Sequence, residues 1–270
     1  MADANPAPVT YAPITDYTSF SFTGPLFANG EDGKHTFKRP VYVRGPETGA
    51  PVLVIQELPG IMPETFRLCD MLVAEGFRVY LPHLFGPLGK MSMFGNLARV
   101  FCMRREFALL EANKTSPIVN WLRALCQQIR TDTGAKGVGA IGMCLTGNFA
   151  ISLMADDAVL AGVASQPSMP LFKEPAALHM SEADVAEVNI KLEEVGPMLG
   201  YRFEGDKFCT GAKFKALDQA FNSGGTEKIK LKTLPGEGHS VLTGHFVDEA
   251  GHPTREAFEE VVSYFRVKLA

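Results

Sequence analysis

Hydrophobic positions along this chain follow two alternating spacings, one typical of strands and one typical of helices. Pro51 to Gln56 form a continuous apolar run that ends in a loop, which predicts a strand buried on both faces. Residues 63–76 then have apolar side chains at helical spacing, with Pro63 at the start and Gly76 at the end. A second strand is predicted within residues 78–86, so the chain alternates strand with helix.

The same alternation continues to the end of the chain. Helices are predicted over residues 116–130, 145–155, 211–225 and 254–270. Strands are predicted over residues 137–143, 159–170, 195–206 and 227–240, of which the second and the fourth run into loops. Ahead of these, residues 19–45 predict a short antiparallel hairpin. Successive strand and helix units imply an α/β fold, with a mostly parallel sheet and helices on both faces.

The length of 270 residues fits one large α/β domain with a sizeable core. We expect residues 19–270 to form this domain, after a loose, proline-rich lead-in over residues 1–18. One segment, 172–194, is charged, helical in propensity and longer than a minimal connection. It is interpreted as a surface helix or insertion, with a lid over an active site as the alternative.

Charge and composition limit the classes of binding partner that the chain is expected to have. The net charge is −4, and no block of like charges offers a footprint for nucleic acid or an anionic membrane. No apolar run reaches the ~18 to 20 residues needed to span a bilayer, and the first residues do not resemble a secretory leader. The expected partner is therefore a small molecule and the expected location is the cytoplasm, while no oligomeric state is predicted.

Cysteine and histidine spacing argue against a metal or disulfide framework. The five cysteines are odd in number and widely spaced, without a C-x-x-C pair. The six histidines show no H-E-x-x-H spacing, and no acidic loop resembles a calcium site. We expect neither a structural disulfide nor a bound metal.

The stretch GVGAIGMCLTG, residues 137–147, supports two incompatible interpretations. Its glycines resemble a dinucleotide-binding turn, which needs a strand before the first glycine and a helix directly after the turn. Here the apolar residues lie among the glycines, so the strand contains them instead of preceding them. The acidic residue some 20 positions on, Asp156 or Asp157, falls at the end of a helix rather than after a second strand. A cofactor's phosphates are therefore not expected at this turn.

The last part of the same stretch, G-x-C-x-x-G, fits a nucleophile on a sharp turn between a strand and a helix. Gly142 and Gly147 leave room for a tight backbone around Cys144. The helix N-terminus behind Cys144 favours its thiolate, and a thiolate is a strong nucleophile. The alternative is an inert cysteine buried at the end of a glycine-rich strand.

A nucleophile on such a turn needs a base and an acid, which follow it in the order nucleophile, acid, histidine. Asp206 follows directly on a predicted strand, whereas the other aspartates downstream fall in predicted helices or at their ends; it could otherwise cap the next helix. His239 follows the strand within 227–240, whereas His245 and His252 lie further on with no strand to position them. His239 is the candidate base, with a solvated loop histidine as the alternative. Glu57, directly after the strand at 51–56, is a fourth candidate.

Together, the segments QELPGI, GMCLTG, FEGD and PGEGHS resemble the dienelactone hydrolase family of α/β-hydrolases, in order and over roughly Phe20 to Phe265. The resemblance implies an α/β-hydrolase fold and hydrolysis of a small ester or lactone without a cofactor. It implies Cys144 as the nucleophile, His239 as the base and Asp206 as the residue that orients the base.

The resemblance also implies secondary roles. Glu57 would interact with the resting thiol and be displaced when substrate binds, and the backbone N–H groups of Leu58 and Leu145 would form the oxyanion hole. Family archetypes bind the carboxylate of their lactone with two arginines, one of them shortly after the catalytic histidine. Here Thr243 stands near that place, and the other arginine would be Arg104 or Arg105, unless these lie on a helix surface.

Two other functions remain open at the level of sequence. The lack of an arginine shortly after His239 favours a broader carboxylesterase or thioesterase that acts on uncharged esters. A binding protein that retains the fold without catalysis is the other possibility, and it would have an inert Cys144.

Overall fold

A single sheet of eight strands organises the computed structural model, which describes residues 11–26, 36–86, 88, 116–168 and 176–270. The strand order across the sheet is β1-β2-β4-β3-β5-β6-β7-β8. β1 and β2 pair antiparallel and β2 is antiparallel to β4, whereas all the pairs from β4 to β8 are parallel. The strands are β1 (Thr18–Pro25), β2 (Thr36–Arg44), β3 (Pro51–Ile55), β4 (Arg78–Pro82), β5 (Val138–Met143), β6 (Val159–Ser165), β7 (Met198–Phe203) and β8 (Ile229–Leu234).

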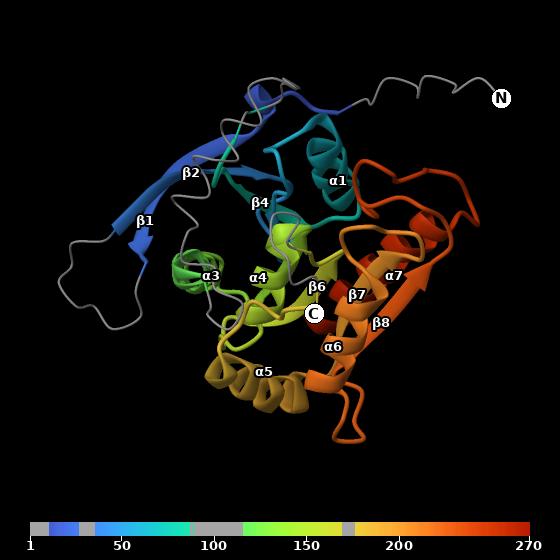
Figure 1. Ribbon diagram of the computed structural model, residues 1–270. Helices are drawn as coiled ribbons and strands as arrows, with labels where there is room; N and C mark the ends of the chain where they lie inside the picture. The colour runs from blue at the N-terminus through green and yellow to red at the C-terminus, as the bar shows by residue number, and fades with distance from the viewer. Residues whose placement is uncertain (1–10, 27–35, 87, 89–115, 169–175) are drawn as a thin grey trace.

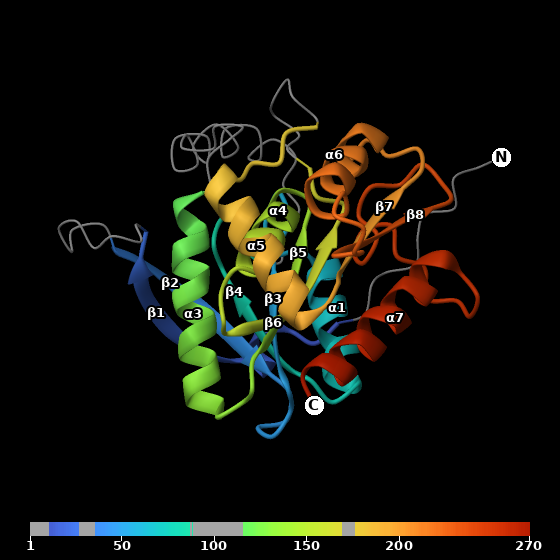
Figure 2. The ribbon, with the colours of Figure 1, turned by 90° about the horizontal axis from the view of Figure 1, so that it is seen from below.

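Helices cover both faces of the sheet, as Figures 1 and 2 show. Residues of α3, α4, α5 and α6 share one hydrophobic cluster with one face, and residues of α1 and α7 share a second cluster with the other. The helices are α1 (Pro63–Ala74), α3 (Pro117–Thr133), α4 (Leu145–Leu153), α5 (Glu182–Val195), α6 (Gly211–Phe221) and α7 (Pro253–Lys268), and a 3-10 turn spans Ile14–Asp16.

The two hydrophobic clusters, one on each face of the sheet, explain why the sequence of a central strand such as β3 is continuously apolar. In β3, Val52 and Val54 face the cluster under α1 and α7, while Leu53 and Ile55 face the cluster under α3 and α4. All four side chains are completely buried. A strand in this position needs an apolar residue at every place, because successive side chains point to opposite faces.

The sequence predictions of fold class and element order are confirmed. The hairpin expected over 19–45 is β1 and β2, and the parallel strands and their helices follow in the predicted order. The division into a lead-in and one domain stays a prediction. Within the segment 172–194, residues from 182 onward belong to α5, which packs against α4 and α6, while 172–175 lie outside the described residues, so a lid role is untested.

Candidate active site

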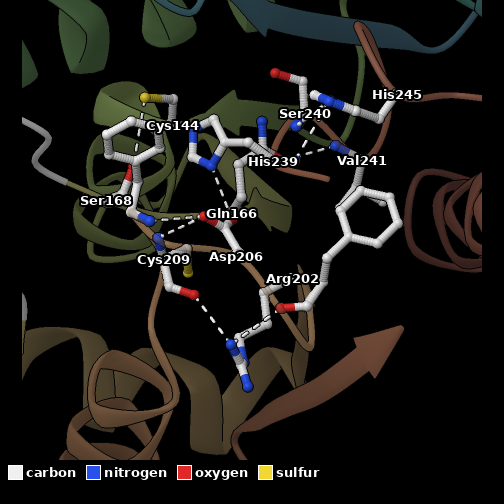
Figure 3. A network of polar contacts seen from close by, with 12 residues as sticks. Cys144, Gln166, Ser168, Arg202, Asp206, Cys209, His239, Ser240, Val241 and His245 are labelled. Carbon is white, nitrogen blue, oxygen red and sulfur yellow. Dashed lines mark hydrogen bonds and ion pairs between the residues drawn. The ribbon is translucent and has the colours of Figure 1, made fainter. Parts of the chain in front are cut away.

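Five loops at one edge of the sheet carry the candidate residues. β3, β5, β6, β7 and β8 run parallel, so their carboxyl ends meet at the same edge. The loops that follow them carry Glu57, Cys144, Gln166, Asp206 and His239, respectively. Figure 3 shows several of these side chains turned toward one another, although the strands that deliver them are far apart in sequence.

Cys144 occupies a sharp turn between β5 and α4. Its backbone has φ 56° and ψ −121°, a conformation that residues with a side chain rarely adopt. Gly142 makes the turn possible, because a Cβ there would lie 2.0 Å from the carbonyl oxygen of Thr146. A Cβ on Gly147 would likewise lie 2.9 Å from the backbone of Pro167. The two glycines are thus needed for close backbone approach around the cysteine, as the sequence pattern predicts.

Ser168 is the hydrogen-bond partner of the thiol. Its hydroxyl lies 3.4 Å from Sγ of Cys144 and donates to it. The serine is held in place because its N–H donates to the Cys144 carbonyl at 3.0 Å and its own carbonyl accepts from Asn148 at 3.2 Å. Sequence reasoning missed Ser168; the only signal was its place in the loop that follows β6 at this edge.

Asp206 and His239 form a buried pair. Oδ2 of Asp206 lies 2.8 Å from Nδ1 of His239, and the aspartate side chain is completely buried. Oδ1 accepts from the N–H groups of Phe208 at 2.8 Å and Cys209 at 3.0 Å. Asp206 does not cap α6, whose N-cap residue is Thr210. Backbone donors on one oxygen therefore fix the carboxylate while the other oxygen faces the imidazole.

The other side of the His239 ring faces the cysteine (Figure 3). Its Nε2 is buried and makes no hydrogen bond of normal geometry within the described residues, while Cys144 acts on the ring through both hydrogen bonding and charge. Burial alone lowers the pKa of His239, but the hydrogen bond to Asp206 and the interaction with Cys144 outweigh it and raise the pKa to about 10. A raised pKa favours the imidazolium, which is the form that results when the ring accepts a proton from the thiol.

Glu57 lies in a separate polar network. Its Oε2 accepts from Ser240 at 2.8 Å and from Gln166 Nε2 at 3.2 Å, and its Oε1 accepts from the Thr243 hydroxyl. Burial raises the pKa of Glu57, although these donors and the charge of His239 oppose that effect. No hydrogen bond joins Glu57 to Cys144 within the described residues, so contact with the resting thiol stays a prediction.

Gln166 connects this network to the loop of the candidate base. Its side chain is fully buried and its backbone φ is 38°. While Nε2 donates to Glu57, Oε1 accepts from the N–H of Val241 at 3.2 Å, two residues after His239. The sequence did not single out Gln166, because neither of these contacts is local in the chain.

The oxyanion hole expected from the amides of Leu58 and Leu145 stays a prediction. Leu145 is the first residue of α4, where N–H groups have no acceptor inside the helix. Leu58 follows Glu57 at the end of β3. Within the described part of the chain, neither amide donates a hydrogen bond to another residue.

The guanidinium of Arg202, which lies next to the candidate residues (Figure 3), is partly engaged by the backbone. The Arg202 guanidinium donates to the carbonyls of Phe203 and Cys209, at 3.0 and 3.1 Å. The predicted substrate contacts Arg104 and Arg105 lie outside the described residues. Among the residues that are described, no three histidine, cysteine or acidic side chains gather as metal ligands, and no helix is long and apolar enough to cross a membrane.

Comparison with known proteins gives one family and many structures of the same fold. The family model described as "Dienelactone hydrolase family" matches residues 40–269. No curated protein sequence matches the chain. An esterase structure from Pyrococcus furiosus has a TM-score of 0.57 at 14% identity, covering 98% of this chain and 99% of its own.

Two further structures show the same likeness. A dienelactone hydrolase-like promiscuous phosphotriesterase from metagenomic libraries has a TM-score of 0.57 at 14% identity, covering 94% of this chain and 100% of its own. An alpha-beta serine hydrolase homologue from Coxiella burnetii has a TM-score of 0.52 at 13% identity, covering 91% and 96%. These likenesses identify the α/β-hydrolase fold.

Proposed function

Because this chain belongs to the dienelactone hydrolase family and is a hydrolase, we propose that it hydrolyses a small ester or lactone through a thioester on Cys144. The observation that carries the proposal is the position of the His239 ring, which bonds Asp206 on one side and faces Cys144 on the other. A nucleophile, a base and a residue that orients the base are the parts that acyl transfer requires.

In the first step, Sγ of Cys144 attacks the carbonyl carbon, and the thiol proton passes to Nε2 of His239. The carbonyl π electrons move onto oxygen and give a tetrahedral oxyanion. When that intermediate collapses, the bond to the alcohol oxygen breaks and the alkoxide takes the proton from His239. The products are a thioester on Cys144 and an alcohol, which in a lactone stays part of the same molecule.

In the second step, water attacks the thioester carbonyl while His239 accepts one proton from the water. The second tetrahedral intermediate expels the Cys144 sulfur, which takes the proton back. The acid is released and the enzyme returns to its starting state. Asp206 holds Nδ1 throughout, so that Nε2 stays directed at the reacting atoms.

The N–H groups of Leu58 and Leu145 hold the oxyanion in both steps. Each such donor contributes about 10²- to 10³-fold, because it meets charge that develops only in the tetrahedral state. The position of Leu145 at the first turn of α4 supports this role, since the positive end of the helix dipole points at the same place. Glu57 would modulate the thiol from its buried network with Gln166, Ser240 and Thr243.

A preference for uncharged esters is the second candidate, and the contacts of Thr243 favour it. Thr243 stands near the place of an arginine that would bind an anionic lactone, and its hydroxyl donates to Glu57. Arg202 is engaged by backbone carbonyls, and Arg67 donates to the Thr243 carbonyl. Each guanidinium thus uses one Nη atom on backbone carbonyls, and its Nε is buried without a hydrogen-bond partner among the described residues.

A hydrolysis screen that pairs neutral aryl esters with anionic lactones tests both statements. We expect turnover by the wild type, loss of turnover in Cys144→Ala with the fold intact by circular dichroism, and faster hydrolysis of the neutral esters. Cys126→Ala, which removes another buried thiol, is the matched control and should retain activity. Turnover by Cys144→Ala would overturn the mechanism, whereas faster hydrolysis of the lactones would overturn only the charge preference.

A further inference from the structure

His245 contacts the backbone of the candidate base directly. Its ring nitrogen Nδ1 accepts from the N–H of His239 at 3.3 Å and from the N–H of Ser240 at 3.2 Å. The backbone N–H of His245 in turn donates to the Ser240 carbonyl at 2.9 Å. Residues 239–245 are thereby closed into a compact loop, with one histidine ring as the common acceptor (Figure 3).

The same ring also packs against the strand that leads to Asp206. The rings of His245 and Phe203 are 6.1 Å apart between centroids and meet edge to face. Gly238 lies between them, because a Cβ there would be 2.8 Å from the Phe203 ring and 2.9 Å from Cγ of His245. His245 is thus in contact with β7, which leads to Asp206, and with the loop that carries His239.

We propose that His245 is a positioning residue that fixes the orientation of the His239 imidazole; this inference rests on the function proposed above. The direction of a side chain follows from its own backbone, and the backbone N–H of His239 is one of the two groups that His245 binds. If that anchor is lost, Nε2 of His239 moves relative to Cys144. Displacement of a catalytic group by about 1 Å can cost on the order of 100-fold in rate.

The contacts of His245 distinguish this role from that of a second base. A nitrogen that accepts two N–H groups carries no proton of its own, so the neutral ring has its proton on Nε2. Within the described residues, His245 makes no hydrogen bond to Cys144 or to Asp206. Position 245 therefore requires a hydrogen-bond acceptor at the place of Nδ1. In a His245→Asn variant, the asparagine Oδ1 would lie at that place.

The experiment compares His245→Leu with His245→Asn on a neutral aryl ester. We expect His245→Leu to lower kcat by roughly 10- to 100-fold with KM almost unchanged, because binding remains while the base is misplaced. His245→Asn should restore kcat to within about threefold of the wild type, because it supplies the acceptor without the imidazole. A contact that only stabilised the fold would not produce a difference in kcat between His245→Leu and His245→Asn when the two variants have equal melting temperatures.

His252→Leu is the matched control. His252 also accepts a backbone N–H through Nδ1, from Thr254 at the start of α7. Its loss should lower the melting temperature while kcat of the folded enzyme stays unchanged. Wild-type kcat in folded His245→Leu, or equal loss in the Leu and Asn variants, would overturn the inference. These outcomes are separate from failure of the proposed function, which would appear as turnover by Cys144→Ala or as no turnover by the wild type.

Discussion

At the scale of single residues, the proposed reaction depends on the hydrogen bonds that orient each polar side chain of the candidate site. The four candidates at strand ends, Cys144, Asp206, His239 and Glu57, could be placed from the sequence because parallel strands deliver residues to one edge. Ser168, Gln166 and His245 could not, because their contacts join loops that are distant in sequence or depend on the shape of a turn. A local sequence pattern predicts that a residue lies at a strand end. It does not predict which side chain from another loop that residue will contact.

The pair of Asp206 and His239 provides a prediction at this scale. In Asp206→Asn, the pKa of His239 should fall well below about 10, because the charge that opposes burial is lost. The change should also lower kcat by about 10³- to 10⁴-fold, since an amide no longer holds the required tautomer. NMR titration of labelled histidine measures the pKa, and steady-state kinetics measure kcat.

Asp218→Asn, on the exposed side of α6, serves as the control for this change and should alter neither quantity. If the pKa of His239 were the same in Asp206→Asn and in the wild type, the hydrogen bond at 2.8 Å would not be the cause of the raised value.

At the scale of secondary structure, the decisive element is the turn from β5 into α4. Within the stretch at 137–147, Gly139 and Gly142 belong to β5 and Gly147 belongs to α4, and this is why the phosphate-binding interpretation fails. Helix ends were also predictable where a residue type has a clear role, as with Pro63 at the start of α1. The backbone conformation of Cys144, with φ 56°, is not encoded in any propensity of cysteine and comes from the packing around the turn.

A substitution in the turn tests this interpretation. Gly142→Ala should destabilise the protein by about 2 to 4 kcal/mol and abolish activity, because the new methyl group meets the backbone of Thr146. Gly224→Ala is the matched control, because a Cβ there has nothing within 4 Å. Its effect should stay within about 0.5 kcal/mol. Urea unfolding of both variants gives the comparison, and equal stability of the two would contradict the close approach at Gly142.

At the scale of the whole molecule, the sequence predicts the class of the fold better than its topology. Alternating strands and helices imply a parallel sheet, and the two hydrophobic clusters confirm that both faces are covered. The position of β4 between β2 and β3 is not contained in the order of the elements, because it depends on the crossover of the connections. That topology brings five strand ends to one edge of the sheet. The candidate site at this edge therefore combines a thiol, an imidazole and two carboxylates.

The most direct test of the central claim is to find the acyl group on the enzyme. The wild type is mixed with a neutral aryl ester, quenched with acid during turnover and digested, and the peptides are measured by mass spectrometry. A thioester intermediate predicts an added acyl mass on the peptide with Cys144, and its absence in Cys144→Ala. An acyl mass on Ser168 or on any other residue, formed at the rate of turnover, would contradict the account.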